Sequence, residues 1–60
     1  MISPSEIREL RKRLGLTQRE LAERLDVNKQ SVCNWETGRH PPLRIFMRKL
    51  EELRDGGEAP

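Results

Sequence analysis

The chain has 60 residues, enough for one small domain near the size at which burial alone only just offsets the entropy cost of folding. Only 33% of the residues are hydrophobic and two are aromatic, which predicts a small aliphatic core and argues against a buried active site. Residues 1–49 carry eleven basic and six acidic side chains, whereas residues 50–60 carry one basic and four acidic ones. This distribution favours an anionic partner for the basic body of the chain.

Cysteine content and the N-terminus bear on the compartment. The single cysteine, Cys33, cannot form an internal disulfide, and a small domain without disulfides suits a reducing compartment. The N-terminus lacks an apolar run of signal-peptide length, and no stretch approaches the ~20 apolar residues of a membrane span. We therefore expect a cytoplasmic protein with no membrane partner.

The first predicted helix begins at a capping box. Ser3–Glu6 places a Ser at the N-cap, a Pro at the first helical position and a Glu at the third. We expect the helix to end near Leu14, because Gly15 can adopt the left-handed backbone that follows many helices. Helical spacing predicts an inward face made of Ile7, Leu10 and Leu14.

The second predicted helix is short and has the same start signal. Thr17–Glu20 is a second capping box, and the helix is expected to run to about Leu25. Its inward residues are Leu21, Ala22 and Leu25.

The third predicted helix follows almost at once. Asn28 is a good N-cap for a helix over residues 29–37, and Gly38 ends it. The turn at 25–28 is too short for an antiparallel return, so the second and third helices are expected to cross steeply. One of them is then left prominent on the surface. The inward residues of the third helix are Val32 and Trp35.

The fourth predicted helix is the longest and follows Pro41 and Pro42, which prevent the third helix from continuing. It is expected to end before Gly56, which gives a domain over residues 1–55 and a disordered tail over 56–60. Ile45 lies outside its apolar stripe. The stripe itself comprises Leu43, Phe46, Met47, Leu50 and Leu53.

The stretch LGLTQRELAERLDVNKQSVCNWETGR resembles the helix-turn-helix of the phage-repressor and Cro class, called the XRE family. The most specific parts are Leu-Gly-Leu-Thr-Gln, Glu-Leu-Ala and Trp-Glu-x-Gly, and the similarity extends over about residues 3–54. The resemblance implies an all-α, compact four-helix domain of the lambda-repressor-like type. It also implies that segment 18–25 crosses the DNA backbone while helix 29–37 enters the major groove.

The residue types on the third helix agree with this implication. Burying Val32 and Trp35 turns Lys29, Gln30 and Asn34 outward, and Cys33 is a further candidate for the same face. Gln and Asn can pair with adenine, and Lys can reach guanine, so we expect these three residues to read bases. The alternative is that they merely solvate a surface helix.

A second set of residues is expected to contact phosphate. Gln18 starts the second helix where family members touch a phosphate, although it would otherwise be an ordinary exposed helix former. Arg39 and His40 follow the third helix and are equally compatible with plain surface positions. The expected phosphate contacts are Gln18, Arg19, Asn28, Ser31 and Arg39.

Several residues are expected to be structural or inert. By resemblance to the family, Arg11 and Glu36 form an ion pair between the first and third helices. Trp35 is expected in the core, because its spacing from Val32 points it inward. Cys33 and His40 are the only soft ligand candidates, too few for a zinc site, and no base is positioned to activate the thiol. We therefore expect no metal, no cofactor and no enzymatic activity.

The sequence departs from the family pattern in three places. Asp26 occupies the turn position where Gly is usual, and Asp tolerates a left-handed backbone better than most residues. Pro42 occupies the place where a Ser or Thr often caps the fourth helix. The chain also ends after four helices, where many relatives have a fifth that helps them dimerise. We expect weak self-association in solution and a homodimer on DNA, with Ile45 and Leu53 as candidate contacts.

Two classes of function follow from these predictions. The first is a sequence-specific transcriptional regulator, a repressor or an activator, that binds a palindromic DNA operator as a homodimer and is nucleoid-associated when bound. The alternative is an antitoxin-like or adaptor module whose main partner is another protein.

Overall fold

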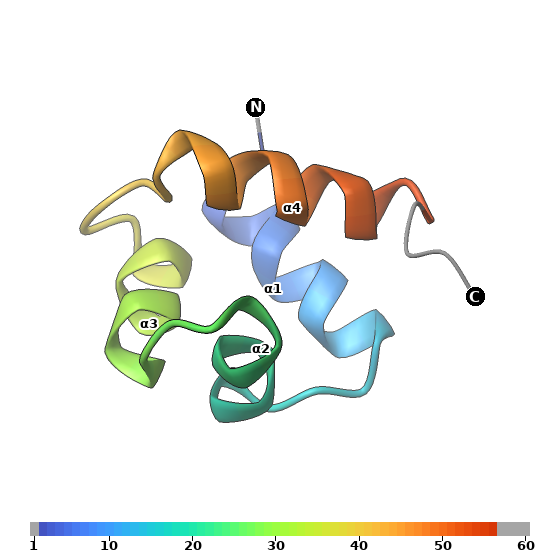
Figure 1. The fold of residues 1–60 in the computed structure, drawn as a ribbon, viewed down its shortest axis with the longest axis horizontal. Helices are drawn as coiled ribbons and strands as arrows, with labels where there is room; N and C mark the ends of the chain where they lie inside the picture. Colours follow the sequence, from blue (N-terminus) through green and yellow to red (C-terminus); the bar gives the residue numbers. More distant parts are fainter. Residues whose placement is uncertain (1, 57–60) are drawn as a thin grey trace.

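The computed structural model describes residues 2–56, which form four helices and no strands (Figure 1). In Figure 1, α4 lies along the upper edge above α1, α2 lies at the opposite edge, and α3 lies at one side. α3 packs against both α2 and α1, and α1 packs against α4. This arrangement confirms the predicted all-α fold. The helices are α1 Pro4–Arg13, α2 Gln18–Leu25, α3 Lys29–Thr37 and α4 Arg44–Arg54.

Both predicted capping boxes are formed. Ser3 Oγ accepts a hydrogen bond from the Glu6 N–H at 3.2 Å, and the Ser3 N–H donates to Glu6 Oε1 at 2.9 Å. Thr17 Oγ1 and Glu20 Oε1 make the corresponding bonds at 3.1 and 2.8 Å. The hydrogen bond from the Ser3 backbone is the main cause of a lowered pKa of Glu6. These bonds satisfy N–H groups at the helix starts that would otherwise have no intrahelical partner.

The turn between α2 and α3 depends on a left-handed residue. Asp26 has φ 59° and ψ 42°, and within residues 2–56 it is the only non-glycine residue with positive φ. The N–H of Val27 then donates to the Ala22 carbonyl at 2.9 Å, which closes the end of α2. Asn28 caps α3 directly afterwards. The prediction that Asp26 adopts the conformation usual for glycine is confirmed.

The core is largely the small apolar cluster that the sequence predicted, with Ile2, Leu16 and Val27 added and Leu43 absent. Ile2, which was not predicted to be inward, is only 4% exposed. It precedes the N-cap of α1, and Ile7 is the fourth residue of the helix, so the two occupy the positions of a hydrophobic staple. The buried apolar residues are Ile2, Ile7, Leu10, Leu21, Ala22, Leu25, Val32, Trp35 and Leu50, and Leu14, Leu16, Val27, Phe46, Met47 and Leu53 pack around them.

The start of α4 differs from the prediction. Leu43, assigned to the inward stripe, is the N-cap of α4 and is 70% exposed. Its backbone is extended, with φ −60° and ψ 157°, so the helical spacing that aligns Leu50 with the core does not apply to it. Pro42, assigned to the capping position, lies one residue earlier and is buried. The start of α4 has no side-chain cap, as the sequence suggested, whereas Ile45 is exposed as predicted.

The C-terminal end of α4 is fixed by α1. Arg13 Nη2 donates to the backbone carbonyl of Arg54 at 2.7 Å, and Arg54 Nη1 lies 3.4 Å from Glu6 Oε2. The predicted tail over 56–60 falls outside the described residues apart from Gly56. Over the described range, no helix is long and apolar enough to cross a membrane.

Candidate nucleic-acid interface

The outer face of α3 consists of polar side chains on a well-anchored helix. Val32, Trp35 and Glu36 are buried, whereas Lys29 and Gln30 are exposed. Asn34 and Cys33 are half-buried at the margin of this face. The structure therefore brings the three predicted base-reading residues, Lys29, Gln30 and Asn34, to the outer side of one helix.

Two of these residues are joined to each other. Gln30 Nε2 donates to Asn34 Oδ1 at 3.1 Å, across one helical turn. Each amide has one oxygen acceptor and two N–H donors, so the bond uses only part of their capacity. Gln30 Oε1 and the Asn34 amide N–H groups remain available, and the pair restricts the rotation of both side chains.

The N-terminus of α3 is organised by Asn28 and Ser31. Asn28 Oδ1 accepts from both the Ser31 N–H and the Ser31 hydroxyl, each at 2.9 Å. The side-chain oxygen of Asn28 thus accepts both capping hydrogen bonds. The side-chain N–H groups of Asn28 donate to no acceptor among the residues described. Ser31 is half-buried and its hydroxyl proton is used within the cap. Both residues were predicted to contact phosphate. Asn28 still has amide N–H groups that can donate to a phosphate, whereas the hydroxyl of Ser31 already donates to Asn28.

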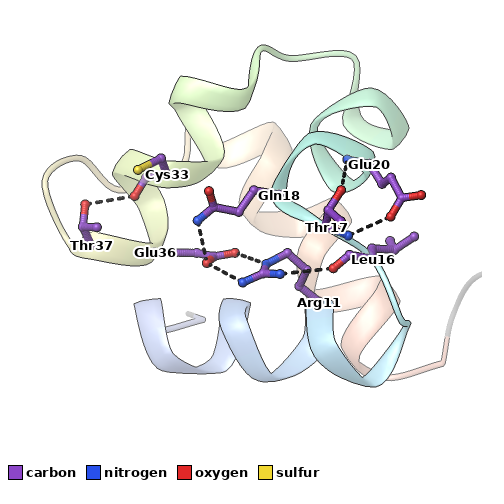
Figure 2. Close-up of polar contacts among 8 residues, drawn as sticks. All are labelled: Arg11, Leu16, Thr17, Gln18, Glu20, Cys33, Glu36 and Thr37. Carbon is purple, nitrogen blue, oxygen red and sulfur yellow. Dashed lines mark hydrogen bonds and ion pairs between the residues drawn. The ribbon is translucent and has the colours of Figure 1, made fainter.

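A buried ion pair holds α3 against α1 (Figure 2). Arg11 Nε donates to Glu36 Oε2 at 2.7 Å, and Arg11 Nη2 donates to Glu36 Oε1 at 3.1 Å. The side chain of Glu36 is 2% exposed and that of Arg11 is 17% exposed. The hydrogen bonds to Glu36 raise the pKa of Arg11, and Arg11 Nη1 also donates to the Leu16 carbonyl at 3.1 Å. This bidentate geometry fixes the position and rotation of α3.

Gln18 adds α2 to the same cluster. Its Nε2 donates to Glu36 Oε1 at 3.0 Å, as Figure 2 shows, so Glu36 accepts hydrogen bonds from residues of both neighbouring helices. The sequence predicted Gln18 as a phosphate contact, with an ordinary exposed helix former as the alternative, and the structure finds its side chain half-buried with one amide donor engaged by a carboxylate. The sequence does not reveal this contact, because Gln18 and Glu36 lie on different helices and no helical spacing relates them.

The backbone at the start of α2 stays open. The capping box uses the N–H groups of Thr17 and Glu20, whereas those of Gln18 and Arg19 make no hydrogen bond within residues 2–56. The positive end of a helix with open N–H groups favours an anion. Arg19 is exposed beside it.

The residues after α3 extend the polar surface. Gly38 ends the helix with φ 79°, and Arg39 and His40 follow it with exposed side chains. Their backbone N–H groups both donate to the Asn34 carbonyl, at 3.0 and 3.4 Å. This places Arg39 directly after the helix that carries Gln30 and Asn34. Thr37, which no sequence motif marked, is exposed on the same face one turn beyond Cys33.

Cys33 is a free, half-buried thiol on α3. No group of three or more His, Cys, Asp or Glu side chains suited to a metal ion occurs in the described part of the chain.

Comparison with known proteins identifies the class of domain. A family model described as helix-turn-helix matches residues 7–53. An uncharacterised HTH-type transcriptional regulator of Methanothermobacter thermautotrophicus is 50% identical over 44 residues, which cover 73% of this chain and 64% of that protein. The chain thus spans just under two thirds of the length of this relative.

A protein of Archaeoglobus fulgidus with the same description is 33% identical over 55 residues, covering 78% of this chain and 79% of the relative. No solved structure matches the chain at a significant level. The structure agrees with this family match, since it has four helices and a left-handed residue between α2 and α3 within the matched residues 7–53. The chain belongs to the helix-turn-helix family of the phage-repressor and Cro class, the XRE family.

Proposed function

We propose that this protein is a DNA-binding transcriptional regulator that inserts α3 into the major groove and reads base edges through Lys29, Gln30 and Asn34. The observation that carries the proposal is the coupled amide pair of Gln30 and Asn34 on the outer face of α3. Amide side chains match the donor and acceptor pattern of adenine in the major groove. The names of the two archaeal relatives support regulation of transcription and do not favour the antitoxin-like or adaptor alternative.

Rigid support of α3 makes this surface suitable for base recognition. Glu36 accepts hydrogen bonds from Arg11 of α1 and Gln18 of α2, so the orientation of α3 is set from two sides. Base readout needs side chains held close to one geometry, because a small displacement removes bidentate hydrogen bonds.

Phosphate contacts are proposed for the groups that flank α3. The open N–H groups of Gln18 and Arg19 at the start of α2 suit a phosphate oxygen, in place of the Gln18 side chain, which Glu36 engages. The amide of Asn28 and the guanidinium of Arg39 supply further donors near the two ends of α3. Ser31 would contact phosphate only as a secondary partner, because its hydroxyl donates within the cap.

A palindromic operator and a homodimer complete the proposal. Two copies would bind half-sites about 34–36 Å apart, so that both α3 helices enter the major groove on one side of the duplex. No ligand or catalytic site is required for this function.

The experiment is selection of bound duplexes from a random pool, followed by binding isotherms of variants on the selected and scrambled sites. Gln30→Ala and Asn34→Ala should each cost about 1–3 kcal/mol on the selected site and much less on scrambled DNA. Because the two side chains are bonded to each other, their effects should not add.

Arg39→Ala should instead weaken binding about equally on every sequence and lower the salt slope by roughly one unit, since one fewer counterion is released. Arg8→Ala, an exposed position on α1, is the matched control and should change neither quantity. If Gln30→Ala and Asn34→Ala keep the wild-type sequence preference, α3 does not read the bases. The antitoxin-like or adaptor function is then better supported.

A further inference from the structure

Two side chains on the outer face of α3 differ in chemistry from the base-reading residues around them. At about 100° per residue, Cys33 and Thr37 fall between Lys29 and Gln30 around the helix axis, one helical turn apart from each other. Thr37 is exposed and Cys33 is half-buried. The outer face of α3 therefore carries a second pair of side chains beside the amide pair, and the chemistry of this second pair decides what it can recognise.

The hydroxyl of Thr37 is engaged by the backbone of its own helix. Thr37 Oγ1 donates to the Cys33 carbonyl at 2.9 Å, as Figure 2 shows. It also lies 3.3 Å from the Asn34 carbonyl. A hydroxyl has one proton to donate, so Thr37 offers an external partner its γ-methyl group and an oxygen lone pair.

The thiol of Cys33 extends this weakly polar surface. A thiol is a weak hydrogen-bond donor and packs as a small apolar group. Cys33 is a free cysteine, so its sulfur is not used in a disulfide. Together the two side chains form an apolar strip between Lys29 and the amide of Gln30, which we call the Cys33–Thr37 strip.

A methyl group is the feature of the major groove that matches such a strip. The other groups that bases expose there are hydrogen-bond donors and acceptors, and an apolar side chain placed over one of them leaves it unpaired, which costs free energy. The C5-methyl group of thymine needs no hydrogen bond, and small apolar side chains contact it in protein–DNA complexes. The strip is therefore suited to a methyl group rather than to a polar base edge.

We propose that the Cys33–Thr37 strip contacts the C5-methyl group of a pyrimidine beside the base that Gln30 and Asn34 read. This inference rests on the proposed entry of α3 into the major groove. Thymine and 5-methylcytosine carry the same methyl group at the same ring position, so the chemistry on α3 suits both. Burying one methyl group changes an equilibrium constant by about fourfold, which sets the size of the expected effect.

Binding isotherms on duplexes with altered methyl groups test the proposal. In the selected site each thymine is replaced in turn by deoxyuridine, which lacks the C5-methyl group and keeps the hydrogen-bonding groups of the base. In a second arm each cytosine is replaced in turn by 5-methylcytosine. The wild-type affinity should fall about fourfold at a contacted thymine or rise about fourfold at a contacted cytosine, and the arm that responds identifies the base.

Substitutions then assign the methyl effect to the strip. Thr37→Ser keeps the hydroxyl and removes the γ-methyl group, whereas Thr37→Val keeps methyl groups and removes the hydroxyl. Thr37→Ser and Cys33→Ser should each reduce the methyl effect to below about twofold, and Thr37→Val should retain it. A hydroxyl that read the base directly would give the reverse order for the two Thr37 variants. Arg8→Ala, at an exposed position on α1, is the control and should keep the full effect.

Circular dichroism should show native helix content in every variant. The proposal is overturned if neither arm changes the wild-type affinity by more than about twofold, or if Thr37→Ser and Cys33→Ser keep the full methyl effect. A missing methyl effect together with a relaxed sequence preference of Gln30→Ala would remove this inference and leave base reading by α3 intact. An unchanged sequence preference of Gln30→Ala and Asn34→Ala would instead contradict the proposed function itself.

Discussion

Removal of either partner of the Arg11–Glu36 ion pair should bring the domain close to unfolding. A 60-residue domain has a total stability of about 3–9 kcal/mol, at 0.05–0.15 kcal/mol per residue. Breaking a buried ion pair by deleting one partner costs about 3–5 kcal/mol, because the survivor is left as an uncompensated charge. The two numbers are of similar size, so each single variant is expected to have a substantial unfolded population at room temperature.

The structure also ranks the two variants. Arg11→Ala leaves the Glu36 carboxylate, 2% exposed, with Gln18 as its remaining donor. Glu36→Ala leaves the Arg11 guanidinium, which is 17% exposed and keeps its bond to the Leu16 carbonyl. The orphaned carboxylate is the more deeply buried charge, so Arg11→Ala should be the more destabilising change. The double variant has no orphaned charge and should cost at least about 1 kcal/mol less than the sum of the singles.

Urea titrations followed by far-UV circular dichroism measure the cycle, with sucrose added equally to all samples to keep the single variants folded at zero denaturant. Arg8→Ala with Glu9→Ala, two exposed residues on the same helix, form the control pair and should each change stability by no more than about 0.5 kcal/mol. Additive effects of Arg11→Ala and Glu36→Ala would refute the reasoning. So would a ranking in which Glu36→Ala is much the worse, since burial of the survivor would then not set the cost.

Three other results follow from single positions. Asp26→Gly should leave stability unchanged or raise it by up to about 1 kcal/mol, because Gly avoids the left-handed strain but has more freedom when unfolded; a loss above ~1 kcal/mol in urea titration would argue against this turn. The pKa of Glu6 is lowered in the folded state, so its contribution to stability is present above its unfolded value of 4.5 and is lost as the pH falls through the folded value. Glu6→Gln should therefore flatten the acid limb of the stability curve, and an unaltered limb would mean that other carboxylates produce it. Leu50→Ala should lower the free energy of unfolding by about 2–5 kcal/mol because the side chain is fully buried. Leu43→Ala should lower it by under about 0.5 kcal/mol because Leu43 is exposed, and equal losses for the two variants would mean that Leu50 is not in the core.

Features that depend on a few neighbouring residues were determined by the sequence alone. Ser3–Glu6 and Thr17–Glu20 form their capping boxes within one helical turn, and Asn28 caps α3 in the same way. Asp26 takes the left-handed conformation because its local bonds to the end of α2 require it. The starts of α1, α2 and α3 followed from their cap residues. The burial of Trp35 followed from spacing, since a helix converts sequence separation directly into a face.

Features that join distant parts of the chain were decided only by the tertiary structure. Gln18 had the sequence signature of an exposed residue at a helix start, but the crossing of α2 and α3 brings its amide to the Glu36 carboxylate. Ile2 and Ile7 have the local spacing of a hydrophobic staple, and the tertiary structure adds the contact of Ile2 with α4, where Met47 Sδ accepts a hydrogen bond from the Ile2 N–H at 3.3 Å. Leu43 has the spacing of an inward residue but is exposed, because the chain becomes helical one residue later. In each case the environment of the side chain depends on an element far away in sequence or on the exact residue at which a helix starts. Local sequence patterns predict neither of these.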